Sequence, residues 1–195
     1  SFRTSWIRKL AAPWFTGARV SRGFFDTLGI RPLLGRTFVL GEDQPGRQFV
    51  AVISEGLWRS RFGSSPSVLG SAIRLSPNAR GEMVTYEIVG VLSNTTPIDY
   101  RTRFDIVVPF VFSDIPRASG NRRTAGLQAV GRLAEGTTIE QAAEEMRTVA
   151  ATLGREYPMG IRGASAAVRP LHEYIFGSAR RISLTTRSWA VPKDR

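Results

Sequence analysis

The sequence predicts an α+β fold in which helices lie on a sheet and a β-rich block interrupts the helical part. Leu127–Leu133 has the two-residue periodicity of a half-buried strand. The residues after it repeat apolar side chains every three or four positions, as an amphipathic helix does. Short β-type runs cluster between Ala72 and Phe112.

The helix of this strand–helix unit carries the strongest local signals in the chain. Thr137, with Glu140 three residues later, is typical of a capping box, which starts a helix. Gly154 suits a C-cap, and Pro158 stops any continuation. Because one face is apolar, we expect this helix to pack on a sheet. That face comprises Ile139, Ala142, Ala143, Met146, Val149, Ala150 and Leu153.

At the N-terminus, Ser1–Trp14 is basic and aromatic and is interpreted as a short amphipathic lead-in or a strand edge. Phe15–Val20 is predicted to be a short strand. Ser21 is a candidate cap for a helix over Arg22–Leu28, and Gly29 is a suitable residue to end it.

The next stretch, Ile30–Phe38, is predicted to be extended, and Gly41–Arg47 to be a polar loop. Phe49–Ile53 is a continuously apolar run typical of a buried strand. Ser54 then caps a predicted helix over Glu55–Phe62.

A β-rich middle follows this helix. It begins with a strand at Ala72–Leu75, which a turn at Asn78–Gly81 joins to a second strand at Val84–Leu92. Phe104–Phe112 is the next predicted strand, and Pro109 indicates a sheet edge or a strand end.

Ala164–Leu171 alternates well enough for a closing strand. The order strand, helix, β-rich block, strand, helix, strand resembles a split ferredoxin-like arrangement with an insertion. The predicted parts are a lead-in (1–14), a core (15–177) and a tail (178–195) whose polar and basic composition predicts disorder. Within the core, segments 15–47 and 114–177 form the helix-on-sheet part, and 48–113 form the inserted β-rich part.

Composition excludes several kinds of chemistry. The chain has 195 residues and no cysteine, so disulfides, thiolate catalysis and cysteine-ligated zinc are excluded.

The longest apolar run, Ile106–Phe112, is far shorter than the roughly 20 residues that span a bilayer. No signal peptide is recognisable, and because the sequence begins at Ser1 without methionine, we expect that the native start is missing.

The net charge of +11 comes almost entirely from arginine, since Lys9 and Lys193 are the only lysines. Such a basic charge balance raises two candidate partners, nucleic acid and anionic lipid. The arginines, however, stand singly or in pairs such as Arg122-Arg123, and no dense basic block appears. A solvated, arginine-rich surface is the favoured interpretation, and a soluble nucleic-acid-binding module is the alternative.

Residues capable of catalysis do not form catalytic patterns. His172, the only histidine, is followed by Glu173 as in zinc proteases, but Phe176 stands where a second histidine is required. Ser54 lies between a strand and a helix, but Val52 replaces the glycine of a nucleophile elbow. We therefore predict no catalytic, cofactor-binding or metal-binding residue.

Four other features have structural interpretations. The acidic pairs Glu42-Asp43 and Glu144-Glu145 are expected to be solvated surface. Gly63–Gly70 lacks the Lys-Ser/Thr that ends a phosphate-binding loop. The sequon Asn94–Thr96 has meaning only in a eukaryotic secretory pathway. The aromatic residues at helical spacing, expected in the core, are Phe24, Phe25, Trp58 and Phe62.

Four segments, in this order, resemble consecutive segments of the MacB-like periplasmic core domain of ABC-transporter permeases of the MacB/FtsX class. They are VSRGFFDTLGIRPLLGRTF (Val20–Phe38), VAVISEGLWRSRFGSSPSVLGSAIRL (Val50–Leu75), YEIVGVL (Tyr86–Leu92) and LQAVGRLAEGTTIEQAAEEM (Leu127–Met146). The chain is most similar to the subgroup of acidobacterial duplicated orphan permeases. The resemblance covers Phe15 to Gly177.

The resemblance implies a porter-like helix-on-sheet part with an inserted β-rich part, on the periplasmic side of the bacterial inner membrane. Such a domain lies between two transmembrane helices and has no catalytic or cofactor residues. The resemblance also implies partners, which are a cytoplasmic ATPase, a paired permease and possible periplasmic adaptors. It implies that the domain couples the motion of the transmembrane helices to export or signalling. Because the chain turns polar and basic after Gly177, where the family continues into an apolar helix, we expect a fragment, a truncated gene or a frameshifted end.

Overall fold

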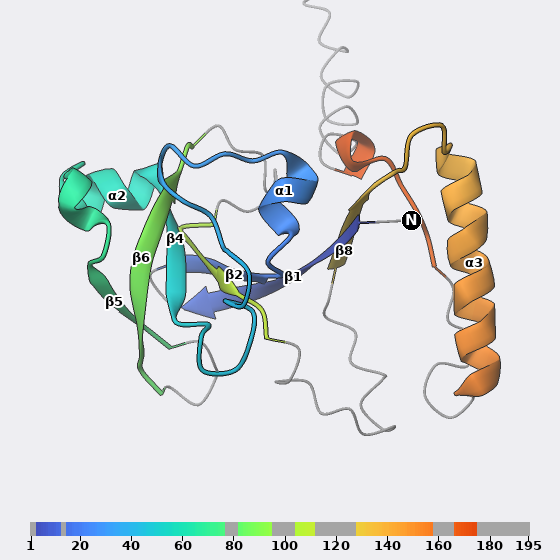
Figure 1. Cartoon of the computed structure of the whole chain (residues 1–195), viewed down its shortest axis with the longest axis horizontal. Coiled ribbons are helices and arrows are strands. Elements are labelled where there is room, and N and C mark those ends of the chain that lie inside the picture. The colour runs from blue at the N-terminus through green and yellow to red at the C-terminus, as the bar shows by residue number, and fades with distance from the viewer. Residues whose placement is uncertain are drawn as a thin grey trace, which may run out of the picture.

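A computed structural model of the chain describes residues 3–12, 15–76, 82–94, 104–111, 128–157 and 166–174. The described strands form one eight-stranded sheet (Figure 1). The strands are β1 (Arg3–Ala12), β2 (Phe15–Val20), β3 (Leu34–Gly35), β4 (Val50–Ser54), β5 (Ala72–Leu75), β6 (Val84–Leu92), β7 (Ile106–Pro109) and β8 (Gln128–Arg132). The helices are α1 (Phe24–Leu28), α2 (Glu55–Phe62) and α3 (Ile139–Glu156), and η1 (Pro66–Val68) is a 3-10 turn.

The sheet is mixed. Its strands lie in the order β3-β6-β4-β7-β2-β1-β8, and β5 pairs with the first half of β6 while β3 pairs with the second. The pairs β2–β7 and β4–β6 are parallel, and the other pairs are antiparallel. The predicted α+β class is therefore confirmed. Strands from the predicted insertion and from the segments around it share this one sheet, and the division into parts stays a prediction.

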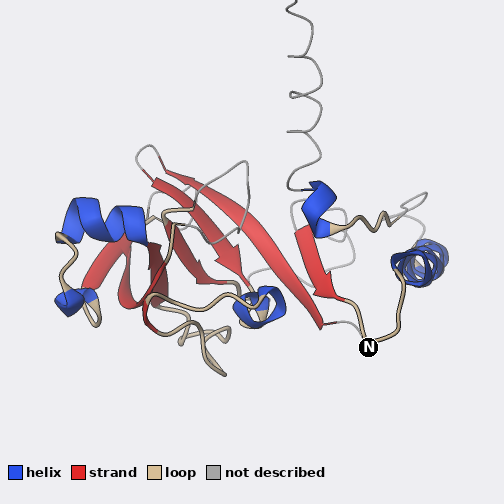
Figure 2. Cartoon of the chain, turned by 90° about the horizontal axis from the view of Figure 1, so that it is seen from above, coloured by secondary structure: helices blue, strands red, loops and turns tan. Residues whose placement is uncertain are grey.

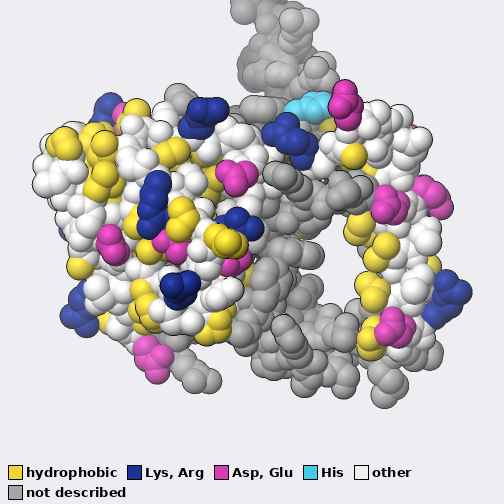
Figure 3. Space-filling view, in the orientation of Figure 1, with side chains coloured by type: hydrophobic (Ala, Val, Ile, Leu, Met, Phe, Trp, Pro, Cys, Tyr) yellow, Lys and Arg dark blue, Asp and Glu magenta, His cyan; other side chains and the backbone are white. Residues whose placement is uncertain are grey.

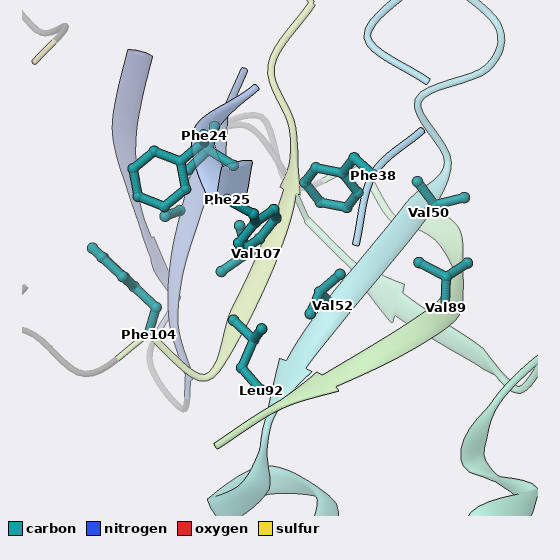
Figure 4. Packing of buried hydrophobic residues seen from close by; sticks show 11 residues of the cluster. Phe24, Phe25, Phe38, Val50, Val52, Val89, Leu92, Phe104 and Val107 are labelled. Atoms are coloured by element: carbon teal, nitrogen blue, oxygen red, sulfur yellow. The ribbon is translucent and has the colours of Figure 1, made fainter. Parts of the chain in front are cut away.

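Apolar side chains cover both faces of the sheet. β4 is a continuous apolar run because successive residues point to opposite, buried faces. Val52 packs in the cluster that contains Phe25 of α1, and Ile53 packs in the cluster that contains Leu57 of α2. Helices α1 and α2 thus lie on opposite sides of the sheet (Figure 2). Figure 4 shows the first cluster, with labels on Phe24, Phe25, Phe38, Val50, Val52, Val89, Leu92, Phe104 and Val107.

The N-terminal segment is an interior strand, not a lead-in or an edge. Arg3–Ala12 pairs with β2 along one side and with β8 along the other. The sequence of residues 1–14 could not reveal this placement, because β8 lies more than a hundred residues further along the chain. Backbone pairing over such a distance leaves no local pattern.

The two short helices differ in how well their starts were predicted. α1 begins at Phe24, two residues later than predicted, with Gly23 at the N-cap and no side-chain cap. Ser21 contributes its carbonyl oxygen, which accepts from the Phe24 N–H at 3.0 Å. Gly29 ends α1 in the left-handed conformation, as predicted (φ 69°). α2 has the predicted bounds.

The strands β2, β5 and β6 have the predicted bounds, and β4 begins and ends one residue later than predicted. β7 is shorter than predicted and ends at Pro109, in keeping with a strand end. It lies between β4 and β2, so the alternative of a sheet edge is wrong. The turn at Asn78–Gly81 and the tail 178–195 lie outside the described residues.

Helix α3 forms where predicted, but its boundaries differ. The capping box joins Thr138 and Gln141, not Thr137 and Glu140. The Thr138 hydroxyl accepts from the Gln141 N–H at 3.3 Å, and the Gln141 side-chain oxygen accepts from the Thr138 N–H at 2.8 Å. The helix passes through Gly154 and ends at Glu156, because helical hydrogen bonds continue one turn further.

The expectation that α3 packs on the sheet is wrong for this structure. The helix stands beside the sheet, beyond β8 (Figures 1 and 2). The physical reason is that β8 offers α3 little apolar surface, because Val130 packs against the first cluster and the opposite face of the strand carries only Ala129 and Gly131.

The predicted closing strand at Ala164–Leu171 is also wrong in its described part. Residues 166–170 have no regular secondary structure and pair with no described strand, and residues 171–174 form a helical turn. Pro170 explains part of this difference, because it cannot donate to a strand ladder and suits the start of a helical turn. Its carbonyl oxygen accepts from the Tyr174 N–H at 3.0 Å.

Candidate functional site

Ser54 is a helix cap, as predicted. Its hydroxyl oxygen accepts from the Leu57 N–H at 3.1 Å. Asn94 adds a second cap, because its side-chain oxygen accepts from the Gly56 N–H at 3.1 Å. The Glu55 carboxylate in turn accepts from the Asn94 N–H at 3.1 Å. The side chain of the sequon asparagine is thus engaged in fixing the start of α2.

His172 lies exposed in the helical turn 171–174. Across the described residues, no group of three or more histidine and acidic side chains could hold a metal ion. The placement agrees with the interpretation of His172 as an ordinary surface residue.

Glu42 holds a loop together, and the expectation that it is merely solvated surface is wrong. Its carboxylate accepts from the Arg36 guanidinium at 2.7 Å and 3.0 Å, and from the Val39 N–H at 2.8 Å. The hydrogen bond from Arg36 to Glu42 is the main cause that raises the pKa of Arg36, and charge attraction from Glu42 and Glu87 adds to it. The sequence did contain a signal for this ion pair, because Arg36 and Glu42 stand on either side of a short loop.

The second acidic pair behaves as predicted. Glu144 and Glu145 lie exposed on α3, and Glu144 accepts from Arg147 within the same helix. Both partners of that ion pair are more than half exposed, so water screens their attraction and it adds little to stability.

The glycine-bounded segment 63–70 closes α2 against the sheet. Gly63 ends the helix in the left-handed conformation (φ 58°). The Trp58 indole N–H donates to the Ser65 carbonyl at 2.8 Å, and Val68 is buried in the second cluster. Of the four aromatic residues expected in the core, Phe24 and Phe25 are fully buried, while Trp58 and Phe62 pack against the second cluster.

A contact that sequence reasoning missed joins β8 to α1. The Arg132 guanidinium donates to the Thr27 carbonyl oxygen at 2.9 Å, near the C-terminal end of α1. Val130, two residues earlier on the strand, packs against the first cluster. Strand alternation therefore places both side chains on the same face, and this periodicity was the available signal.

The end of the molecule formed by β8 and α3 is the candidate interaction surface. Only Val130 is half-buried among the side chains of β8. On α3, Met146, Val149 and Leu153 are 36%, 43% and 36% exposed. Figure 3 shows hydrophobic side chains along the edge of α3 that faces the rest of the molecule, across an open gap. A row of large, exposed apolar side chains indicates a surface that packs against another part of the protein or against a partner.

The charge of α3 differs from that of the chain as a whole. The helix carries four glutamates and two arginines, whereas the chain has a net charge of +11. Elsewhere, Arg36 and Arg59 form ion pairs with Glu42 and Glu55. No described element gathers the arginines into one continuous basic stretch, so no specific observation favours a nucleic-acid interface.

Comparison with protein families gives one match. The family model described as MacB-like periplasmic core domain matches residues 4–149. This match begins earlier than the predicted resemblance at Phe15 and ends before Gly177. A comparison with curated proteins found no match.

Two solved structures share the fold. One is the periplasmic region of MacB from Actinobacillus actinomycetemcomitans, with a TM-score of 0.52 and 13% identity, covering 83% of this chain and 66% of that one. The other is a domain of a putative permease protein from Porphyromonas gingivalis, with a TM-score of 0.50 and 18% identity, covering 80% of this chain and 64% of that one. The chain thus spans just under two thirds of the length of each. Over the described residues, no helix has the length and apolarity needed to cross a bilayer.

Proposed function

The chain belongs to the family of MacB-like periplasmic core domains, and from this premise we propose that it couples ATP-driven motion of a permease to work outside the membrane. The motion would arise in transmembrane helices of the same ABC-transporter permease, and the work would be substrate export or signalling to a partner protein. The domain itself would catalyse nothing. Its location is extracytoplasmic, as for the family.

The observation that best supports a coupling role is that the first and the last strand along the chain, β1 and β8, pair with each other. β1 and β8 are antiparallel neighbours, and Arg3 at the start of β1 lies opposite Arg132 at the end of β8. The chain therefore enters and leaves the sheet at the same end. A domain inserted between two membrane helices needs this arrangement, because both connections must point toward one bilayer.

A coupler must also move as a unit, and the sheet provides stiffness. Apolar clusters on both faces bury β4 and β7 between them. Close packing of this kind transmits displacement instead of absorbing it. Motion of such a body relative to a second domain is the rotation that switching proteins commonly use.

The proposed partners follow from the same role. They are a cytoplasmic ATPase, the transmembrane helices of the same or a paired permease in a dimer, and a periplasmic adaptor. No cofactor or metal is included in the proposal.

The test uses the parent permease with its ATPase in proteoliposomes. We expect deletion of the domain to leave membrane insertion intact and to uncouple ATP hydrolysis from transport. Arg132→Ala, which removes the link between β8 and α1, should reduce transport per ATP hydrolysed. The matched control is Arg147→Ala, which removes an exposed ion pair on α3 and should leave the ratio unchanged. Unchanged coupling in the deletion variant would contradict the proposal.

A further inference from the structure

Helix α3 is well formed, yet one of its faces is apolar and uncovered. It has 18 residues and a complete capping box, and Ala142 is its only buried residue. Met146, Val149 and Leu153 stand one above another on the same face and are exposed. These three residues form the docking stripe. Because a single helix of this length is only marginally stable in water, such a stripe normally packs against another segment.

The docking stripe is accessible in the described part of the chain. α3 shares no extensive contact with any other described helix or strand. It stands at the end of the molecule, beyond β8 (Figures 1 and 2). Figure 3 shows the hydrophobic side chains of α3 along the border of an open gap. A segment of another protein can therefore reach the stripe without displacing a described helix or strand.

Carboxylates line one flank of the docking stripe. Glu145 and Glu156 are eleven positions apart, which is three helical turns, so they lie on the same flank about 16 Å apart along the helix axis. Both side chains are exposed. Arg147 lies on the other flank, where it is bonded to Glu144. The stripe therefore presents apolar surface beside negative charge.

We propose that the docking stripe binds an amphipathic helix of a partner protein that carries basic residues along one flank. The spacing of Met146, Val149 and Leu153, three residues and then four, is the spacing with which two helices interlock their apolar side chains. Apolar side chains of the partner would cover the stripe. Lysine or arginine side chains of the partner, about three turns apart, would meet Glu145 and Glu156.

Charge disfavours the other occupants of the stripe. In an antiparallel pair of two α3 helices, Glu145 of one copy would approach Glu156 of the other, and like charges would repel. Helices that lie on membrane surfaces carry lysine and arginine on their polar face, whereas this flank carries carboxylates. The same carboxylates would repel the phosphates of nucleic acid.

This inference adds a binding surface and does not depend on the proposed coupling function. The chain as a whole is strongly basic, with a net charge of +11, so long-range attraction favours acidic partners. A preference for a basic helix would therefore have to arise at α3 itself, where glutamates outnumber arginines four to two.

Two synthetic peptides, each as long as α3, test the proposal on the full chain. Both carry leucine at the first and fourth positions of a seven-residue repeat. One peptide has lysine along the flanks of its leucine stripe, and the other has glutamate at the same positions. In an NMR titration of the isotope-labelled chain at physiological salt, we expect the lysine peptide to shift the amide signals of α3 and the glutamate peptide to leave them unchanged.

Charge reversal on α3 provides the second measurement. Glu145→Lys combined with Glu156→Lys should weaken binding of the lysine peptide about tenfold, because two attractive pairs become repulsive, and should let α3 bind the glutamate peptide. The matched control combines Glu140→Lys with Glu144→Lys. It changes the net charge equally on the opposite face of the helix and should leave the affinity for the lysine peptide nearly unchanged.

Val149→Asp tests the apolar part of the site. Because Val149 is exposed, the substitution leaves the core intact, and circular dichroism checks that the helix persists. It should abolish binding of the lysine peptide, since a carboxylate would be buried within the apolar contact.

The inference is overturned if the lysine peptide does not shift α3, if the two peptides bind the native helix equally, or if Val149→Asp leaves binding unchanged. It is also overturned if sedimentation shows that the chain self-associates through α3, because a second copy would then be the occupant. None of these results bears on the coupling test, which measures transport per ATP hydrolysed.

Discussion

The guanidinium of Arg132 donates to the carbonyl oxygen of Thr27 at 2.9 Å, across 105 positions of sequence. This bond joins the last strand of the sheet to the C-terminal turn of α1, where a positive charge also offsets the helix dipole. Together with Val130, which packs against the first cluster, it anchors one face of β8 although most of the strand is exposed.

Arg132→Ala tests this anchor. Loss of a hydrogen bond from a charged group to a part-buried carbonyl should lower the free energy of unfolding by about 1.5 kcal/mol. Urea denaturation followed by tryptophan fluorescence measures the change. Arg147→Ala is the control, because its exposed ion pair with Glu144 should contribute little. Equal losses of unfolding free energy for the two substitutions would show that the Thr27 contact contributes no more to stability than an exposed ion pair does.

Gly90→Ala should be strongly destabilising. A Cβ atom at Gly90 would lie 2.1 Å from the backbone carbonyl oxygen of Arg36, which cannot move without separating β3 from β6. Overpacking of this kind costs about 3 kcal/mol. Gly56→Ala is the comparison, because an added Cβ there meets nothing closer than 3.5 Å and lies in a helix. Thermal unfolding of both variants measures the difference, and a Gly90→Ala variant as stable as the original would refute the close contact.

Substitutions at adjacent threonines distinguish two capping boxes. Thr138→Ala should destabilise α3 by about 1 kcal/mol, whereas Thr137→Ala should have a smaller effect. Because α3 is not packed on the sheet, the change should appear as faster amide exchange within α3 and not as a shift of global unfolding. A larger effect from Thr137→Ala would favour the box predicted from the sequence.

Glu42→Gln should loosen the turn around Val39. The carboxylate accepts three hydrogen bonds, and the hydrogen bonding from Arg36 is the main cause that raises the pKa of Arg36, with the charge of Glu42 adding to it. A raised folded-state pKa of a cation means that its stabilising contribution is present below its unfolded value and is lost only as strongly alkaline pH is approached. We therefore expect a loss of about 1 kcal/mol that stays constant from neutral to mildly alkaline pH. A marked change over that range, measured by denaturation, would point to another titrating group.

Binding to DNA tests the alternative function. The scattered arginines predict at most weak, non-specific binding to duplex DNA at low salt, and none at physiological salt. Fluorescence anisotropy with a labelled duplex over a salt series measures this. Retention at physiological salt, with a slope corresponding to several phosphates, would restore the nucleic-acid hypothesis.

Local patterns predicted the elements whose partners are close in sequence. β5 and β6 form an antiparallel pair joined by a short connection, and their bounds agree with the alternation and turn signals. Ser54 and Gly29 cap their helices as predicted, because a cap depends on the next few backbone groups alone. The shift from Thr137 to Thr138 shows the limit, since two adjacent threonines both have a suitable residue three positions later.

Several of the predictions that failed required knowledge of how separate parts of the chain meet in space. The role of Arg3–Ala12 as an interior strand depends on β8, and the bonds of Glu42 depend on how a loop folds back on Arg36. The stripe of α3 was predicted to be buried but is exposed. Amphipathicity shows which face of a helix can pack, but it does not show whether a partner is present.

By itself, the sequence determined the α+β class, the bounds of β2, β5, β6 and α2, the caps Ser54 and Gly29, and the family resemblance, because these depend on residues that are neighbours along the chain. Only the tertiary structure decided that β1 joins β8, that helices α1 and α2 cover opposite faces, and that α3 stands beyond the last strand. The physical reason is that strand order and helix docking are settled by backbone pairing and packing between distant segments, which no local pattern encodes.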